Sequence, residues 1–459
     1  MNKIIQAGSK EAMTNKQFLE REINKFKTST KRKLMFTGEN YYLGEHDILD
    51  RKRTVIGEGG ALQEVTNLPN NKQIDNQYAK MVDQKVNYLL GKPITLGTDN
   101  KQYEAALQKI FNKKFHRMLK NIGENALNCG ICWLHPYYND VGELCLKRFD
   151  GYEILPFWKD AEHTILEFAI RLYEVQGYDG KREVTIEKVE VYTPTGIDRY
   201  ILSKDKPYAW DKIPLIPFKY NHKELPLIVR VKSLQDGINV MLSDFQNNMQ
   251  EDARNTILVI KNYDGENLAE FRHNLATYGA VKVKTVDGAD GGIDTLTVEI
   301  NSENYKTILH IFKNALIENA KGYDAKDDRL MQGNPNQMNI QSMYSDIDLD
   351  ANGMETEFQA SFEELLWFVN VHLANNGEGN FENQEVEIIF NRDILINESE
   401  SIGNCQTSVG ILSTETIVSQ HPWVSDVEQE LERLKKEKEE IINDLYNEAF
   451  NPVGNEDEE

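Results

Sequence analysis

Three cysteines and one histidine lie close enough in the sequence to suggest a metal site. They are Cys129, Cys132, His135 and Cys145, and thiolate and imidazole groups are the ligands that zinc prefers in proteins. The surrounding residues alternate as in a β-hairpin, however, and a cysteine in a strand is commonly a small buried hydrophobic residue. The pattern therefore favours core packing, and we expect neither a metal nor another cofactor.

A second segment, "DLDANGMETEFQ", nearly matches a calcium-binding loop. Its ligand positions hold Asp348, Asp350 and Asn352, followed by Gly353. The twelfth position is Gln359, although a calcium loop needs a bidentate carboxylate there. We therefore interpret the segment as acidic residues on a long helix.

Motifs for nucleotide binding and hydrolysis are incomplete. The stretches "GEGG" and "DGADGG" lack the Lys-Ser or Lys-Thr pair of a phosphate-binding loop, and "LGKPIT" lacks the preceding glycine. The sequence has no G-x-S-x-G motif, no H-E-x-x-H motif and no convincing Ser/His/Asp set. It therefore predicts a protein that is not an enzyme.

Length and composition indicate a globular chain. Its 459 residues are 40% hydrophobic and 27% charged, enough to bury a large core in roughly two to four domains. No run approaches the roughly 20 apolar residues of a membrane helix, and the polar start lacks the apolar core of a signal peptide. Four cysteines favour free thiols in a reducing compartment. We therefore expect no membrane partner.

The chain is strongly acidic, with a formal net charge of −22. Tight binding to nucleic acid needs a local excess of Lys and Arg that neutralises phosphates. The overall charge therefore argues against a protein that holds nucleic acid firmly. It is compatible with an acidic surface that lets DNA slide past.

The elements that would position these residues begin with helices and continue as an antiparallel sheet. Helical patterns cover residues up to about 40, 73–90 and 101–127. Alternating strands follow in a hairpin around Asn139 and Gly142, and then at 163–175, 182–194 and 198–204. This order predicts an α+β fold.

In the second half of the chain, the residue pattern predicts a small α/β module between two helices that could run antiparallel. The helices cover 228–254 and 302–321, and the module has strands at 256–261, 280–286 and 293–300 with a helix at 266–277. A polar loop follows, and then a long helix at 337–375 with a bend expected at Gly353.

Two helix starts lie near the end of the chain. Ser413 is expected to cap a short helix that reaches Ser419, and Pro422 prevents its continuation. Ser425 and Glu428 have the spacing of a capping box, so a second helix with a narrow apolar stripe should begin there.

Four separated segments carry a resemblance to a known family. They are "YYLGEHDILDRKR" (41–53), "NLPNNKQIDNQYAKMVDQKVNYLLGKPI" (67–94), "EFRHNLATYGAVKV" (270–283) and "SQHPWVSDVEQELERL" (419–434). In this order they resemble the portal proteins of tailed bacteriophages, of the type found in long-tailed phages of Gram-positive hosts. The resemblance covers nearly the whole chain apart from the short acidic tail.

The resemblance implies a portal fold of the α+β class, in which segments of the chain have separate roles in a ring. These segments are an α/β wing at 1–227, stem helices at 228–255 and 302–322, a small α/β clip at 256–301, a tunnel loop at 323–336, a long bent bracing helix and following strand at 337–397, and a helical crown with an acidic tail at 398–459.

It also implies a function. Portal proteins form a homo-oligomeric ring of about twelve copies, or about thirteen when isolated, at one capsid vertex. Double-stranded DNA is packaged and ejected through the channel. The implied protein partners are the terminase large subunit, the major capsid and scaffolding proteins, and a head-completion or adaptor protein. The implied location is the virion, with assembly in the host cytoplasm.

Two groups of residues are the sites that this resemblance implies. The tunnel loop would contact DNA weakly through Lys326 and Arg329, with Gln332, Asn334 and Asn336 as polar neighbours. The alternative is that these are simply solvated loop residues. The clip would dock partner proteins near Asp287, Asp290 and Asp294.

Two other functions stay open from the sequence. A metal-dependent enzyme acting on nucleic acid could use the carboxylates at 346–352 and the cysteine cluster. A capsid scaffold protein that forms no ring is the other alternative. Chelator-sensitive activity would indicate the first, and the mass of the assembled protein would identify the second.

Overall fold

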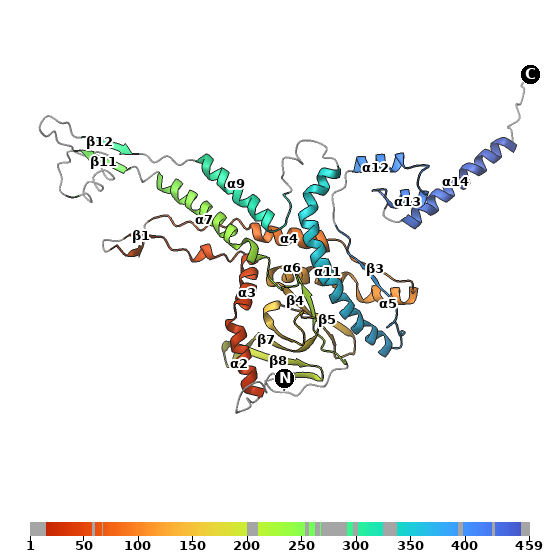
Figure 1. Cartoon of the computed structure of the whole chain (residues 1–459), viewed down its shortest axis with the longest axis horizontal. Helices are drawn as coiled ribbons and strands as arrows, with labels where there is room; N and C mark the ends of the chain where they lie inside the picture. Colours follow the sequence, from red (N-terminus) through yellow and green to blue (C-terminus); the bar gives the residue numbers. More distant parts are fainter. Residues whose placement is uncertain are drawn as a thin grey trace, which may run out of the picture. The chain divides into compact units, whose positions relative to one another are not determined.

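The computed structural model shows two compact units (Figure 1). It describes residues 15–56, 60–66, 68–199, 210–252, 257–261, 267, 292–296, 302–324, 337–392, 398–424 and 427–450. The larger unit comprises Met1–Gly322 and Ala351–Asn391, and the smaller comprises Tyr323–Asp350 and Arg392–Glu459. Helices are combined with antiparallel strands, which confirms the α+β class.

Two helices, α2 (Asn15–Thr28) and α3 (Thr30–Leu43), occupy the region where the sequence predicts one. Ser29 separates them, because its backbone is extended and its side chain accepts a hydrogen bond from the N–H of Arg32. Gly44 ends α3 with a φ of 89°, a left-handed conformation that glycine adopts without strain.

Asparagine caps set the starts of the next three helices, α4 (Gln77–Leu90), α5 (Lys101–Ile110) and α6 (Lys113–Cys129). The helix predicted at 73–90 begins later than expected because Asn76 caps it. The single helix predicted at 101–127 is wrong. Phe111 leaves the helical conformation and Asn112 caps a new helix.

The hairpin predicted after α6 is confirmed. It consists of β4 (Ile131–Tyr138) and β5 (Leu144–Phe149), and β10 (Ile216–Lys219) pairs with the other edge of β4. All three strands are antiparallel, with Trp133 opposite both Phe149 and Pro217. Trp133 is fully buried, so this sheet contributes directly to the core.

A four-stranded antiparallel sheet forms the second layer. Its strands are β6 (Ile154–Trp158), β7 (Leu166–Asp179), β8 (Arg182–Thr193) and β9 (Gly196–Arg199), in that order. The strands β7 and β8 fall where the sequence predicts alternating strands, and β9 overlaps the start of the one predicted at 198–204, of which residues 200–204 lie outside the described part of the chain. The strand β6 was not predicted. Phe18 and Phe26 of α2 pack on this sheet, and a second cluster around Trp133 and Tyr192 joins the two sheets.

Three short strand pairs are also present among the described residues. They are β1 (Thr54–Ile56) with β2 (Leu62–Glu64), β3 (Thr95–Gly97) with β13 (Glu387–Ile389), and β11 (Ile257–Lys261) with β12 (Gly292–Leu296). The pairing of β11 with β12 agrees with the strands predicted at 256–261 and 293–300. The helix predicted at 266–277 and the strand at 280–286 lie outside the described residues.

The long helices also agree with the sequence. They are α7 (Ile228–Asp252), α9 (Ser302–Asn319) and α11 (Gln337–Asn375). The helix α11 continues through Gly353, where the expected bend stays a prediction. In the larger unit, Phe358 and Phe362 of α11 pack on Phe218 of β10.

The smaller unit contains α12 (Glu398–Thr407), α13 (Thr414–Ser419) and α14 (Val427–Phe450). The predicted cap of α13 is confirmed, because Ser413 accepts a hydrogen bond from the N–H of Thr416. The helix ends at Ser419, before Pro422, as expected. The proposed capping box lies partly outside the described chain, since Ser425 is not described.

Candidate functional site and family

The helix pair α7–α9 carries the strands β11 and β12 at one end (Figure 1). A Cβ on Gly237 would come within 2.8 Å of the Phe312 ring, so glycine permits close approach of the two helices. Further along, Asn248 donates a hydrogen bond to the Tyr305 hydroxyl at 3.2 Å. The later residue on α7 thus contacts the earlier residue on α9, which confirms the antiparallel arrangement.

A row of polar side chains on α7 holds residues 71–78, a segment that leads into the first turn of α4. The backbone N–H groups of Asn71, Gln73, Asp75 and Tyr78 donate to the side-chain oxygens of Asn247, Ser243, Asn239 and Gln235, respectively, at 2.7–3.1 Å. We name these four acceptors the α7 row. All four are at most 2% exposed, and their hydrogen bonds offset the free-energy cost of burying polar groups.

The spacing of the α7 row follows from the geometry of the two partners. Four residues of an α-helix rise about 6 Å, and two residues of an extended chain advance about 6.6 Å. From Asn71 to Asp75, every second residue of the segment can therefore meet every fourth residue of α7, and the two run in opposite directions. The fourth partner, Tyr78, lies three residues further on, in the first turn of α4. The sequence interpretation missed this contact, although polar residues at i, i+4 spacing were the available signal.

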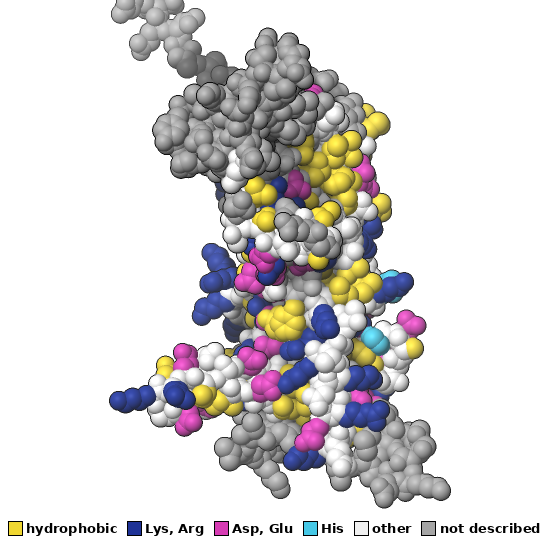
Figure 2. All heavy atoms as spheres, turned by 90° about the vertical axis from the view of Figure 1, so that its left-hand side faces the viewer, with side chains coloured by type: hydrophobic (Ala, Val, Ile, Leu, Met, Phe, Trp, Pro, Cys, Tyr) yellow, Lys and Arg dark blue, Asp and Glu magenta, His cyan; other side chains and the backbone are white. Residues whose placement is uncertain are grey.

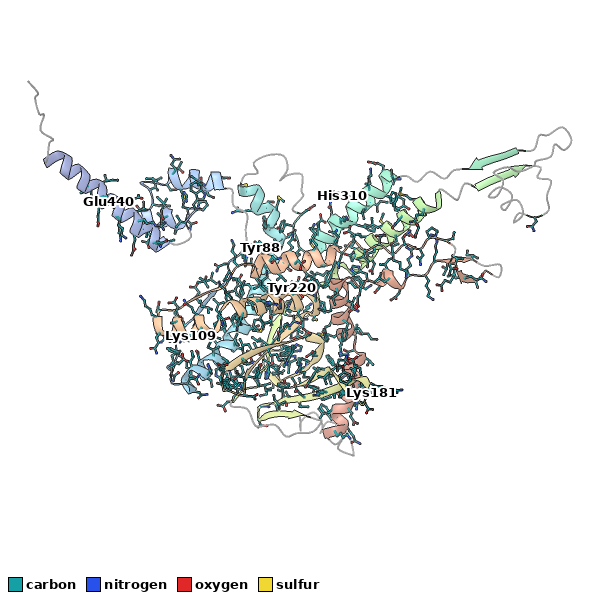
Figure 3. The ribbon with its side chains drawn as sticks, turned by 180° about the vertical axis from the view of Figure 1, so that it is seen from behind. Tyr88, Lys109, Lys181, Tyr220, His310 and Glu440 are labelled. Carbon is teal, nitrogen blue, oxygen red and sulfur yellow. The ribbon has the colours of Figure 1, made fainter. Side chains whose placement is uncertain are left out.

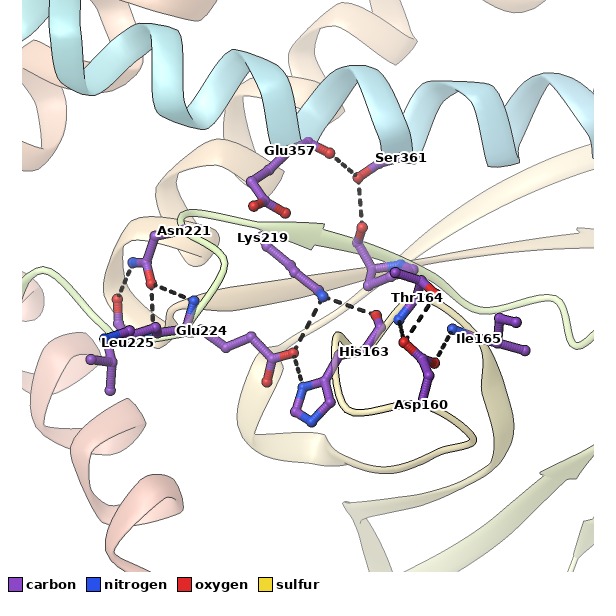
Figure 4. Close-up of polar contacts among 12 residues, drawn as sticks. Asp160, His163, Thr164, Ile165, Lys219, Asn221, Glu224, Leu225, Glu357 and Ser361 are labelled. Carbon is purple, nitrogen blue, oxygen red and sulfur yellow. Dashed lines mark hydrogen bonds and ion pairs between the residues drawn. The ribbon is translucent and has the colours of Figure 1, made fainter.

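Glu224 is the buried centre of an ionic cluster (Figure 4). One carboxylate oxygen contacts His163 Nδ1 at 2.7 Å and Lys219 Nζ at 3.5 Å, and the other contacts Lys31 Nζ. Burial alone would raise the pKa of Glu224, but Lys31, His163 and Lys219 together lower it below its ordinary value. The carboxylate is therefore held ionised in the interior.

This cluster joins three elements of the larger unit. Lys31 belongs to α3, Lys219 to β10 and His163 to the loop before β7. Glu224 and His163 both have positive φ values, 54° and 58°, which are uncommon for residues with a side chain. Both carboxylate oxygens are engaged by cations, so the arrangement serves structure and leaves no free base for chemistry.

The residues assigned to DNA contact and most of those assigned to docking lie outside the described chain. They are Lys326, Arg329, Gln332, Asn334 and Asn336 in the loop, and Asp287 and Asp290 in the clip. Asp294 is placed in β12, opposite Val259 of β11. The structure therefore brings none of these residues together, and their roles stay predictions.

The four residues that resembled a zinc site belong to the core and its edge. Cys132 donates a hydrogen bond to the Phe149 carbonyl at 3.5 Å, and His135 Nδ1 contacts the Pro214 carbonyl at 2.6 Å. Burial raises the pKa of the Cys129 and Cys132 thiols and lowers that of His135 to about 4. Within the described ranges, no group of three or more His, Cys, Asp or Glu is arranged to hold a metal ion.

The segment that resembled a calcium loop lies within α11, as the sequence interpretation favoured. Its helical backbone separates the carboxylates, and Asp348 forms an ion pair with Arg392 in the smaller unit.

In the part of the chain that the structure describes, no helix is both long enough and apolar enough to cross a membrane.

Comparisons with known proteins identify the family of this chain. The family model described as "Phage portal protein, SPP1 Gp6-like" matches residues 24–444. The portal protein of Bacillus phage SPP1 is 30% identical over 428 residues, which cover 88% of this chain and 83% of that protein. The portal protein of Clostridium phage phiCD119 is 28% identical over 448 residues, covering 91% of this chain and 96% of that protein. The resemblance stated from the sequence is confirmed, and the chain belongs to the SPP1 Gp6-like family of phage portal proteins.

Proposed function

We propose that this chain forms the ring-shaped channel at one capsid vertex through which double-stranded DNA is packaged and ejected. The family match over residues 24–444 is the observation that carries this proposal. The family is structural and not enzymatic, in agreement with the sequence interpretation. The rival interpretation as a metal-dependent enzyme is therefore set aside.

The proposed roles follow the segments assigned from the sequence. The wing comprises 1–227, and the bracing helix and following strand comprise 337–397. The stem comprises 228–255 and 302–322, the clip 256–301, the tunnel loop 323–336 and the crown 398–459. The antiparallel pair α7–α9 supports the stem assignment, and the β11–β12 pair between these helices supports the clip assignment.

The proposed assembly is a ring of about twelve copies that remains in the virion after assembly in the host cytoplasm. The clip, including Asp287, Asp290 and Asp294, would dock the terminase large subunit and later the head-completion or adaptor protein. The wing surface would meet the capsid and scaffolding proteins. Because partners act in succession, exposed and modest contacts suit this role better than permanent ones.

The net charge of −22 suits a channel that must not retain DNA. Acidic side chains repel phosphates, whereas many firm cation contacts would hold the duplex and oppose its movement. Lys326 and Arg329 in the tunnel loop would supply weak contacts that a ring repeats around one duplex.

Electron microscopy and mass measurement of the purified chain test the assembly. We expect a closed ring with cyclic symmetry, and its mass separates this function from a scaffold that forms no ring. A protein that stays monomeric at the concentrations used for packaging would contradict the proposal. A ring that does not support packaging in assembled procapsids would contradict the channel role.

A further inference from the structure

The strands β7 and β8 extend well beyond the strands on either side of them. The strand β6 pairs with β7 only as far as Arg171, and β9 pairs with β8 only from Glu190. Beyond these positions β7 and β8 continue as a two-stranded ribbon, in which Glu174–Asp179 pair with Arg182–Glu187. These six pairs extend roughly 20 Å, at about 3.3 Å per residue. We name residues 174–187 the β7–β8 arm.

No residue of the β7–β8 arm is buried, although the bases of the same strands lie in the core. The side chain of Tyr178 is 76% exposed and that of Ile186 is 39% exposed. A two-stranded hairpin by itself is marginally stable in water, and it needs a third strand or a surface that packs on it. The arm would therefore gain stability from a surface that covers it.

The β7–β8 arm has one apolar face, because side chains alternate between the two faces of a ribbon. Val175, Val184 and Ile186 share this face. Ile186 lies over Gly177, since a Cβ on that glycine would come within 2.7 Å of the Ile186 side chain. Nearer the base of the strands, the same face is covered by the cluster around Trp133. The apolar face thus continues beyond the residues that cover it.

The opposite face of the arm is polar and lies toward α2. It carries Glu174, Gln176, Tyr178, Glu183, Thr185 and Glu187. The carboxylate of Glu187 forms an ion pair with Lys27 of α2 at 2.5 Å, and Phe18 and Phe26 of α2 pack on the same face nearer the base. The apolar face is therefore turned away from α2, and this helix cannot cover it.

The β7–β8 arm points across the direction in which α7 and α9 leave the larger unit. In Figure 1 this helix pair extends toward the left. Figure 2 views the molecule from that side, and at the height of β7 and β8 the arm projects to the left of the body, with hydrophobic side chains among charged ones. Figure 3 labels Lys181, which lies in the turn at the tip of the arm. The arm therefore projects sideways from the helix pair.

We infer that the β7–β8 arm docks through its apolar face on the next copy of this chain in the ring. The inference rests on the proposed ring and adds an element that joins neighbouring copies. If α7 and α9 line up along the channel, neighbouring copies stand beside the helix pair, which is the direction in which the arm points. The arm and the surface that receives it differ, and repeated contacts of this head-to-tail kind close into rings.

The chemistry of the arm favours a second copy over the partners that act in succession. Interfaces that stay assembled are more apolar than transient ones, and the exposed face of the arm consists of Val175, Val184 and Ile186. The outer edges of the arm also have unpaired backbone groups, which would add hydrogen bonds to a neighbouring chain. A permanent contact between copies suits both features.

Two substitutions on the apolar face test the inference in the full-length chain. Val184→Thr with Ile186→Thr removes apolar groups but keeps β-branched side chains, which favour a strand. The matched control, Gln176→Thr with Thr185→Ser, changes two residues on the polar face of the same arm. Ring formation is measured by mass photometry over a range of protein concentrations, with circular dichroism as the check on folding.

Photo-crosslinking tests the contact without changing the apolar face. The exposed Tyr178 near the tip is replaced by p-benzoylphenylalanine, an aromatic residue that bonds to nearby C–H groups on illumination. Illuminated rings should give covalent dimers and longer products of this chain on a denaturing gel. The same chain at concentrations too low for rings should stay monomeric.

We expect the apolar-face variant to need roughly tenfold more protein to form rings, because each contact would bury less apolar area. The control should assemble like the unmodified chain. If the unmodified chain forms no ring, the proposed function fails and this inference fails with it. If it forms rings but the apolar-face variant assembles equally well, or no crosslinked products appear, only this inference fails. An equal loss of assembly in the control would attribute the effect to the strands of the arm and not to its apolar face, which also overturns it.

Discussion

The side-chain oxygen of Asn239 accepts a hydrogen bond from the backbone N–H of Asp75 at 3.1 Å. The amide nitrogen of the same side chain donates to His46 Nδ1 at 2.8 Å. Burial lowers the pKa of His46, so its neutral ring accepts from Asn239 and directs its Nε2–H to the Tyr41 carbonyl. One buried amide thus links α7 to two separate parts of the larger unit.

Replacement of Asn239 by Leu should destabilise the larger unit by about 2–3 kcal/mol. The change would leave the Asp75 N–H and the His46 ring without their partners in a buried setting. Chemical denaturation measures the loss. The control is Gln246→Ala on the same helix, which removes only an exposed side-chain contact with Gln73 and should cost under about 0.5 kcal/mol. Equal losses in both variants would contradict a special role for the α7 row.

Replacement of Glu224 by Gln should destabilise the protein by about 3 kcal/mol at neutral pH, because Lys219 and Lys31 would lose a buried counter-charge. The pKa of Glu224 is lowered by folding. Its contribution is therefore complete above the unfolded pKa, about 4.3, and is lost as the pH falls through the folded value. Denaturation at several pH values should show the variant and the parent converging in acid. The exposed pair Lys27–Glu187 is the control, and Lys27→Ala should cost under about 1 kcal/mol.

For Glu364 of α11 we expect the opposite dependence of folding stability on pH. Burial raises the pKa of its carboxyl to about 7, although Lys212 and Lys219 act in the other direction. Because the folded pKa lies above the unfolded one, this group reduces stability as the pH rises from about 4.3 through 7. Glu364→Gln should therefore gain on the order of 2 kcal/mol relative to the parent between pH 5 and pH 8. A difference that does not change with pH would count against this assignment.

Gly237→Val should weaken the packing of α7 on α9. The new side chain would meet the Phe312 ring, and overpacking of this kind costs about 1–3 kcal/mol. Phe312→Leu in the same chain should recover part of the loss. The matched control is Gly353→Ala in α11, where a Cβ would meet nothing within 4 Å and the gain in helix propensity should be about 1 kcal/mol. Thermal melting of all four chains compares these effects.

Lys326→Glu combined with Arg329→Glu should leave ring assembly intact and shorten the DNA that is packaged or retained. Each cation would contribute little to binding, but a ring repeats the pair around one duplex, and charge reversal turns weak attraction into repulsion. The measurement is DNA length in assembled procapsids. Full-length packaging and normal retention would leave the solvated-loop interpretation of these residues standing.

Local signals in the sequence predicted much of the fold. The spacing of apolar residues placed α7, α9 and α11 within a few residues of their ends, and Ser413 correctly marked the start of α13. These features depend on contacts between near neighbours in the chain. The late start of α4 and the break between α5 and α6 were missed because the asparagine caps at 76 and 112 were overlooked.

Contacts between segments that are far apart in the sequence could not be predicted from local patterns. A polar row on a helix is commonly exposed, and only the fold shows that residues 71–78 cover the α7 row. In the same way, nothing near Glu224 in the sequence indicates that Lys31 and His163 converge on it. A groove beside α11, β3 and β13 also combines residues from three separate parts of the chain. The candidate sites named from the sequence were chosen by resemblance, and their roles remain to be tested by the variants above.

The four hydrogen bonds between the α7 row and residues 71–78 are arranged so that a force along α7 acts on all of them at once. They cross between two antiparallel segments at successive helical turns, which is a shear geometry. A force across the helix would instead open them one after another from an end, as in peeling. The helix α7 is therefore anchored most strongly against being pulled along its own axis, and most weakly against being lifted sideways.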